Sequence, residues 1–297
     1  MPHATIVDVH RLAIDEPFEV YNAAREQYLT SHQLIEFARN PLLYRKKRLG
    51  LVSDGDTESF RLGRATHTLI LEGEEKFRRE WVVGGPINPK TGAPYGEDTK
   101  AYAEWREQQG KPCVSDAEYL TCLAMRAGVL MHEEAAGILA DGIAERTVRS
   151  EIHGFAVQAR FDWLTMDARL ADLKTCAVLD DFEADLWRYG YPWQQAFYLM
   201  VAHAAGLRLP IESTLIAVEK VEPFRCGVFK LTAPTLCACI KDLTAALWAL
   251  RQANDQPSDW PTGAEGIRVV RRPRSLPAFG GEFIDRARYG AKEESWL

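Results

Sequence analysis

The sequence ARFDWLTMDARLADLKTC, residues 159–176, places charged side chains inside two short apolar runs. Both runs have the composition of β-strands, and the DAR between them predicts a turn that joins them as a hairpin. Side chains two residues apart share one face of a strand, so Asp172 and Lys174 point one way and Leu173 points the other. The predicted hairpin then brings Asp162 beside Asp172.

Two carboxylates on one face repel each other, and this repulsion raises the pKa of one of them. A divalent cation removes the conflict, because Mg²⁺ prefers oxygen ligands. Such a cation lowers the pKa of a bound water, and the Lys174 ammonium positions or activates that water against a phosphorus. The pattern therefore favours phosphodiester chemistry. An ordinary cross-strand ion pair between Asp162 and Lys174 is the alternative.

The net charge of the chain restricts how it can bind nucleic acid. The net charge is −6 over 297 residues, so contacts to DNA must come from local basic patches. One candidate patch follows the predicted helix that Pro41 interrupts, and it consists of Arg45, Lys46, Lys47 and Arg48. Such a run holds phosphates in some proteins and is a solvated surface in others.

The sequence shows no signal-like leader and no apolar run of about 18 residues, which predicts a cytoplasmic protein that does not enter a membrane. The six cysteines are typical of reduced, mostly buried thiols. Cys237 and Cys239 form the one close pair, and their spacing is not that of a zinc or thioredoxin-like site. We interpret this pair as core packing in a helix.

The order of the predicted elements favours an α/β fold. Helical patterns extend to about residue 146, and strand character begins near Val148. A hairpin, a helix, a second hairpin and a long amphipathic helix then follow. We predict a single domain over residues 1–297. Its predicted parts are an N-terminal extension at 1–27, a mainly helical part at 28–146, the sheet and helices that carry the site at 147–255, and an irregular tail at 256–297.

Five stretches of the chain, taken in order, resemble the PD-(D/E)XK nuclease superfamily, and more closely its RecE-type (exonuclease VIII) branch from prophage recombination systems. These stretches are YLTSHQLIEFARNPLLY, LGRATHTLILEGE, ARFDWL, ADLKTCA and YGYPWQQAFYLM. The resemblance implies a restriction-endonuclease-like core, in which a central mixed sheet is flanked by helices, with a helical elaboration at the N-terminus. It also implies that Asp162, Asp172 and the Leu173 carbonyl bind metal and that Lys174 is catalytic.

Four further positions match the motifs of that branch. Gly63 and His67 match its Gly-x-x-x-His, which implies that His67 binds metal; a core histidine on an apolar helix is the alternative. Gln194 and Tyr198 match its Q-x-x-x-Y and share one helix face at a spacing of i and i+4, which implies that they position the phosphate or the attacking water. Their alternative is ordinary helix packing. Relatives often carry His before this Gln, whereas this chain carries Pro192 and then Trp193.

Two weaker candidates lie near Asp162. Glu151 is predicted on the same strand, where it would bind a second metal or orient His67; a solvated strand residue is the alternative. Arg160 would share the face of Asp162 and either pair with an acid or touch phosphate.

The resemblance implies a Mg²⁺-dependent 5′→3′ exonuclease, with Mn²⁺ as a substitute, that degrades linear duplex DNA and leaves 3′ single strands. It also implies a RecT-like single-strand annealing partner and a homo-oligomeric ring. The predicted channel of that ring is lined by the basic run or by Arg268, Arg271, Arg272 and Arg274.

No iron–sulfur cluster is expected, because the cysteines lack the spacing of the branches that carry one. A P-loop motif is also absent from the sequence. Two other functions remain open for the same fold. One is a non-catalytic module that binds DNA ends or protein, and the other is an endonuclease. The first predicts a lost acid or lysine, whereas His67, Asp162, Asp172 and Lys174 are all present.

Overall fold

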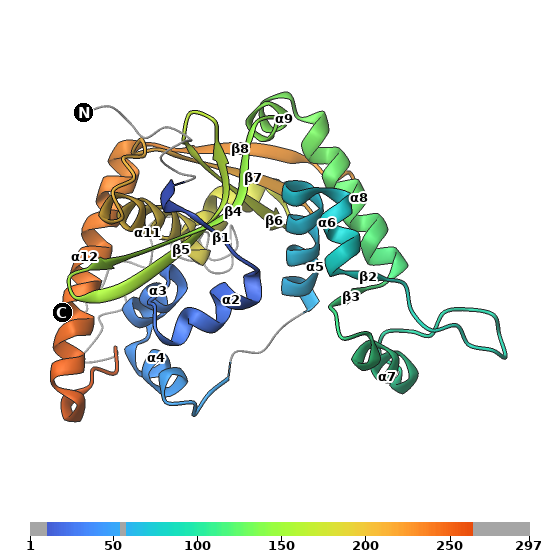
Figure 1. Cartoon of the computed structure of the whole chain (residues 1–297), viewed down its shortest axis with the longest axis horizontal. Coiled ribbons are helices and arrows are strands. Elements are labelled where there is room, and N and C mark those ends of the chain that lie inside the picture. Colours follow the sequence, from blue (N-terminus) through green and yellow to red (C-terminus); the bar gives the residue numbers. More distant parts are fainter. Residues whose placement is uncertain (1–10, 54–57, 264–297) are drawn as a thin grey trace, which may run out of the picture. The chain divides into compact units, whose positions relative to one another are not determined.

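The computed structural model describes residues 11–53 and 58–263, and a six-stranded sheet forms its centre (Figure 1). The sheet has the order β1-β4-β5-β6-β7-β8. Its strands are β1 (Ile14–Asp15), β4 (Gly142–Ile152), β5 (Phe155–Thr165), β6 (Leu170–Cys176), β7 (Ser213–Glu219) and β8 (Cys226–Leu231). The pairing of β6 with β7 is parallel and the others are antiparallel. The predicted α/β fold with a mixed sheet is confirmed.

Helices precede, connect and follow the strands. They are α2 (Phe18–Ala23), α3 (Ser31–Arg39), α4 (Pro41–Arg48), α5 (Glu58–His67), α6 (Gly73–Glu80), α7 (Lys100–Gln109), α8 (Asp116–Met131), α9 (Glu133–Leu139), α10 (Phe182–Tyr189), α11 (Tyr191–Ala204) and α12 (Ala233–Asp255). The two-residue strands β2 (Val82–Val83) and β3 (Cys113–Val114) form a separate parallel pair. The crossover from β6 to β7 contains α10 and α11, since parallel neighbours need a long connection.

Local sequence explains where the first helices begin and end. Thr30 and Gln33 form a capping box at the start of α3, which satisfies backbone N–H groups that no helical carbonyl reaches. The Asn40 side chain caps α4, and Pro41 occupies its first turn, where a missing N–H does no harm. The predicted interruption at Pro41 is therefore confirmed as a boundary between two helices.

Two hydrophobic cores lie on opposite faces of the sheet. The first is formed with α3, α10, α11 and α12, and the second with α5, α6, α8 and α9. Phe161 belongs to the first core, but Trp163, two residues later on β5, belongs to the second. The regular alternation of β5 therefore changes at Asp162, at the junction of the two cores.

The partner strand is irregular at the same level. Pairing of β4 with β5 runs from Gly142 opposite Thr165 to Ile152 opposite Phe155, and the one step missing from this register is Glu145 opposite Asp162. Glu145 has a left-handed backbone with φ of +54°. A non-glycine residue in this region is uncommon and is often found at functional sites.

One prediction about the sheet is wrong. The stretch from Val148 to Thr165 was expected to be one strand, but a turn at His153 and Gly154, with φ of +50° and +80°, divides it into β4 and β5. Two consecutive residues with positive φ match the twist of a two-residue hairpin. The strand also begins earlier, at Gly142.

Helix α12 has the length and mean hydropathy, 1.2, of a membrane-spanning segment. One side of it is nevertheless buried in the first core; the buried residues are Leu236, Cys239, Leu243, Leu247, Leu250 and Ala253. This is how a core helix of a soluble domain packs. The tail arginines named above, Arg268, Arg271, Arg272 and Arg274, lie outside the described residues.

Candidate active site

Asp162 fills a gap between β5 and β6. The two strands pair at Leu164 with Leu170 and at Trp163 with Ala171. One step further, Asp162 lies opposite Asp172, and the ladder stops there. The N–H of Leu173 instead donates to Oδ2 of Asp162, with an N–O distance of 3.0 Å. The structure thus brings Asp162 and Asp172 together as the hairpin pattern predicts.

Asp172 is 2% exposed and is held on both sides. Its Oδ1 accepts a 2.8 Å hydrogen bond from Nε2 of Gln195. The Lys174 ammonium lies against Oδ2, but this oxygen has no hydrogen bond of regular geometry. Burial, followed by the nearby Asp162 charge, raises the pKa of Asp172. With Gln195 on one oxygen and Lys174 on the other, the buried carboxylate is held in one orientation.

Lys174 remains charged in this environment. Burial alone lowers the pKa of Lys174, but the Asp172 and Asp162 carboxylates outweigh burial and raise the pKa above its ordinary value. The ammonium also lies 5.0 Å from the centre of the Tyr191 ring, which stabilises a cation through the ring face. Lys174 is therefore a fixed positive charge at neutral pH.

His67 ends α5 and faces Asp162. Its Nδ1 lies 3.5 Å from Oδ2 of Asp162. Burial, followed by the Lys174 charge, lowers the pKa of His67 to about 4. The imidazole is then neutral at pH 7, which is the form that binds metal. A π-helical turn, Thr68–Glu72, follows directly, and such turns are frequent at functional sites.

Glu145 is a site residue that the sequence patterns missed. It lies opposite Asp162, and the ligand atoms of His67, Glu145 and Asp162 all lie within 4.8 Å of one another. Burial, followed by the Asp162 charge, raises the pKa of Glu145. The signal that would have revealed it was the HG turn. When a hairpin is closed at His153 and Gly154, counting residues back along both strands from the turn places Glu145 opposite Asp162.

The structure places the two weaker candidates differently. Arg160 is buried, and its Nε lies 2.5 Å from Oε2 of Glu145, so it pairs with an acid. Glu151 does not join the cluster and its prediction is wrong. It is paired with Ala156 on β5, and the six residues from Ala156 to Asp162 span roughly 20 Å of strand.

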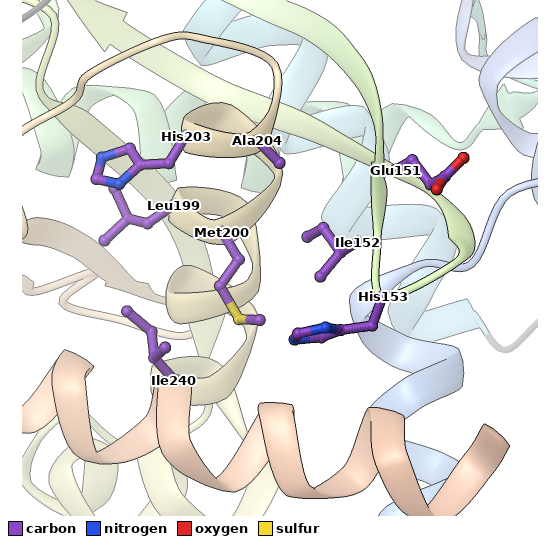
Figure 2. A pocket seen from close by; sticks show the side chains of 8 residues that line it. All are labelled: Glu151, Ile152, His153, Leu199, Met200, His203, Ala204 and Ile240. Carbon is purple, nitrogen blue, oxygen red and sulfur yellow. The ribbon is translucent and has the colours of Figure 1, made fainter. Parts of the chain in front are cut away.

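The surroundings of Glu151 form a separate cavity of about 400 Å³ (Figure 2). His153 and Ile152 from the hairpin, Met200 from α11 and Ile240 from α12 contribute to its wall. Glu151 lies there because the turn at His153 and Gly154 places it at the end of the hairpin opposite to Asp162.

Helix α11 contributes both glutamines to the interior, with different partners. Gln194 donates a 2.8 Å hydrogen bond from Nε2 to the Tyr198 hydroxyl, and both residues are buried. They share a helix face as predicted, and burial raises the pKa of Tyr198 well above its ordinary value. The neighbouring Gln195 is the residue that contacts Asp172, and Oγ of Ser213 donates to its Oε1 at 2.7 Å.

Gln195 was not predicted. The signal was the Gln–Gln dipeptide itself, but which of the two faces the sheet depends on how α11 is rotated. That rotation follows from the start of α11, where Gly190 has φ of +83° and Pro192 lies in the first turn.

Trp193, which stands where relatives often carry His, donates to Oδ2 of Asp242 on α12 at 2.9 Å.

Among the described residues, no contact joins the basic run on α4 to the carboxylates of the site. Lys47 pairs with Glu36, and Arg48 donates to the backbone carbonyls of Arg25 and Glu26 at 3.1 Å and 3.0 Å. The Arg45 guanidinium lies 5.1 Å from the centre of the Trp260 ring, and Lys46 is exposed. Arg45 and Arg48 border a cavity of about 420 Å³.

The donor set at the junction fits a divalent cation. It offers the carboxylates of Asp162 and Glu145 and a neutral His67, whose ligand atoms lie within 4.8 Å of one another, and Asp172 and the Leu173 backbone lie beside Asp162. Hard cations such as Mg²⁺ and Mn²⁺ take oxygen ligands of this kind, and Mn²⁺ also accepts imidazole. The arrangement can therefore hold one reactive water beside a fixed positive charge.

Comparison with known proteins agrees with this geometry. A family model described as a PDDEXK-like domain of unknown function (DUF3799) matches residues 31–273. No curated protein matches the sequence. A crystal structure of a presumptive exonuclease from Eubacterium rectale matches with a TM-score of 0.62 and 14% identity, over 88% of this chain and 97% of that chain. At this identity the likeness concerns the fold alone.

A phage-related exonuclease from Haemophilus somnus 129PT matches with 12% identity over 77% of this chain and 96% of that chain. Its TM-score is 0.35, which supports no argument about this chain.

Proposed function

This chain belongs to the PDDEXK-like family DUF3799, and from that premise we propose that it is a divalent-metal-dependent deoxyribonuclease. The observation that carries the proposal is the cluster at the end of the β5–β6 pairing. There Asp162 accepts from the Leu173 N–H, Asp172 is held by Gln195, and Lys174 lies against Asp172. An acid pair on two adjacent strands, with a lysine next to one of the acids, suits phosphodiester hydrolysis.

The residues divide the work as follows. Asp162, Asp172, His67 and the Leu173 carbonyl would hold the cation. When bound, the cation supplies a water of lowered pKa and a Lewis acid for the phosphate. Lys174 would orient the water and stabilise the negative charge that develops on the phosphate. Burial of this cluster strengthens each of these interactions.

We further propose the finer properties that the RecE-type resemblance implies. These are 5′→3′ degradation of linear duplex DNA, Mg²⁺ with Mn²⁺ as a substitute, a ring of identical chains and a single-strand annealing partner of the RecT type. The five ordered motifs support them. Because the net charge is −6, a contact to DNA must come from a local basic patch, and we propose the basic run on α4 as that contact.

The test uses linear duplex DNA labelled at either the 5′ or the 3′ ends, with Mg²⁺ or with EDTA, beside a closed circular duplex. Early loss of 5′ label that requires Mg²⁺, with the circle intact, is the expected result. Cleavage of the circle would instead identify an endonuclease. Binding to DNA ends without cleavage under Mg²⁺ or Mn²⁺ would identify a non-catalytic module and overturn the proposal.

A further inference from the structure

We propose that Glu145 is a ligand of a single divalent cation, so that Glu145 on β4, Asp162 on β5 and His67 at the end of α5 close around one ion. The inference rests on the proposed metal-dependent function and adds a residue that neither the sequence motifs nor the family description assigns. Its test separates the two, because metal binding is measured independently of DNA cleavage.

The first argument is distance. The ligand atoms of His67, Glu145 and Asp162 lie within 4.8 Å of one another, and among the described residues these three form the set that could hold an ion. Two ligand atoms that each lie about 2.1 Å from one octahedral Mg²⁺ are about 3.0 Å apart when adjacent and about 4.2 Å apart when opposite. The 3.5 Å between Nδ1 of His67 and Oδ2 of Asp162 already falls in this range, and rotation of the Glu145 side chain between staggered rotamers would bring its oxygen closer.

The second argument concerns which oxygen is available. Arg160 donates from Nε to Oε2 of Glu145, and among the described residues this is the hydrogen bond that Glu145 receives, so Oε1 is left for a ligand. Arg160 is itself fixed, because its Nη1 donates to the backbone carbonyl of Glu16 at 2.8 Å. Glu16 lies outside the region that the family model matches, residues 31–273. Arg160 is thus a positioning residue for Glu145.

The third argument concerns the number of ions. Among the described residues, one group of His, Cys, Asp and Glu side chains brings three ligand atoms within 4.8 Å of one another, and it consists of His67, Glu145 and Asp162. The geometry therefore provides for one ion.

The alternative is that Glu145 only neutralises Arg160. The two roles predict different results for Glu145→Gln, which keeps the shape and an oxygen acceptor for Arg160. A ligand role predicts weaker cation binding, because a neutral amide replaces a carboxylate ligand. An ion-pair role predicts unchanged cation binding and a lower melting temperature, because Arg160 loses its buried counter-charge.

The experiment is a Mn²⁺ titration of the full chain, with free Mn²⁺ followed by electron paramagnetic resonance, together with thermal unfolding in EDTA. The variants are Glu145→Gln and, as a matched control on the same strand, Glu151→Gln. We expect one ion per wild-type chain, at least tenfold weaker binding in Glu145→Gln, and wild-type binding in Glu151→Gln. Loss of even an outer residue of a metal site commonly weakens binding by about 10- to 100-fold.

Wild-type Mn²⁺ affinity in Glu145→Gln, or two ions per wild-type chain, would overturn the inference. If Glu145→Gln does not fold, Glu145→Asp retains the charge with a shorter reach, and wild-type affinity in that variant would also overturn it. If wild-type protein binds one Mn²⁺ through Glu145 but does not cut DNA, the inference stands and the proposed nuclease function fails.

Discussion

The Leu173 N–H donates to Oδ2 of Asp162 at the position where β5 and β6 stop pairing. A side chain thereby replaces the backbone acceptor that a continuing ladder would supply. This substitution leaves the Leu173 carbonyl unpaired with β5, while Asp172 and Lys174 on either side point toward α11. The end of one strand pairing therefore creates the site, and its supporting residues lie on α5, α11 and β4.

The support of Asp172 by Gln195 gives a first prediction. Gln195→Leu leaves Oδ1 of Asp172 and the Ser213 hydroxyl without their partners in a buried place, so we expect a loss of about 1–3 kcal/mol in the free energy of unfolding. Mn²⁺ binding should weaken by about tenfold or more, because the carboxylate loses its orientation. Ser213→Ala removes only the outer hydrogen bond and should change both quantities less. Urea unfolding and Mn²⁺ titration measure them, and wild-type Mn²⁺ affinity in Gln195→Leu would contradict the account.

Lys174 is expected to affect turnover rather than metal binding. Its pKa is raised because the carboxylates outweigh burial, so it acts as a constant positive charge. Lys174→Gln should reduce the rate of DNA cleavage by about 10²-fold or more. Cation affinity should stay equal or rise, since a positive neighbour is gone. Comparison of cleavage rate with Mn²⁺ affinity decides the point: equal losses in the two would indicate that Lys174 is only an ion-pair partner of Asp172.

A pH-dependent prediction concerns Glu219 at the end of β7. Its carboxylate accepts from the Arg225 side chain at 2.7 Å and from the Leu179 N–H at 2.8 Å, and these bonds lower its pKa to about 2. A carboxylate whose pKa is lower in the folded state stabilises the fold above its unfolded pKa, about 4.3, and this contribution is lost as pH falls toward 2. Glu219→Gln should therefore lower the free energy of unfolding at pH 7 by about 1–3 kcal/mol.

The difference between wild type and Glu219→Gln should shrink as pH falls from about 4.5 to 3, since Glu219 of the unfolded chain, with a pKa of about 4.3, takes up a proton there while the folded carboxylate stays ionised. Urea unfolding at pH 7, 4.5 and 3 measures it. A difference that does not depend on pH would show that Glu219 acts through shape and not through charge.

Gly63, which matches a family motif, is predicted to tolerate alanine. A Cβ at Gly63 would lie 3.9 Å from Oγ1 of Thr175, an ordinary contact, and alanine in a helix interior is favoured over glycine by about 0.5–1 kcal/mol. Gly128 on α8 is the matched control, because a Cβ there would lie 2.2 Å from the Phe224 carbonyl oxygen. We expect a slightly higher melting temperature for Gly63→Ala and a lower one for Gly128→Ala. Destabilisation by Gly63→Ala would show that α5 and β6 approach more closely than this.

The parts of the site that sequence predicts are those within one local element. Asp162, Asp172 and Lys174 follow from strand alternation and one turn, because a hairpin register is set by counting from that turn. The pairing of Gln194 with Tyr198 follows from the i and i+4 spacing of a helix. His67 lies on a different element, and the sequence connected it to the hairpin only through the family resemblance.

The parts that were missed depend on irregular geometry. Glu145 joins the cluster because the HG turn, which lacks the usual Asn-Gly or Asp-Gly signal, folds β4 back on β5. Its own left-handed backbone then removes it from the ladder. Gln195 rather than Gln194 reaches Asp172 because of the rotation of α11. The wrong prediction for Glu151 has the same origin as the missed Glu145, since both depend on where the strand turns.

The most direct test of the central claim compares wild type with Asp172→Asn on linear duplex DNA, with Mg²⁺ and with EDTA. Release of acid-soluble nucleotide by wild type in Mg²⁺ alone, reduced by about 10²–10³-fold or more in a folded Asp172→Asn chain, is the predicted result. Circular dichroism and melting temperature verify the fold of the variant. Degradation by Asp172→Asn at the wild-type rate would contradict the account, because the carboxylate at the end of the β5–β6 pairing would then play no part in cleavage.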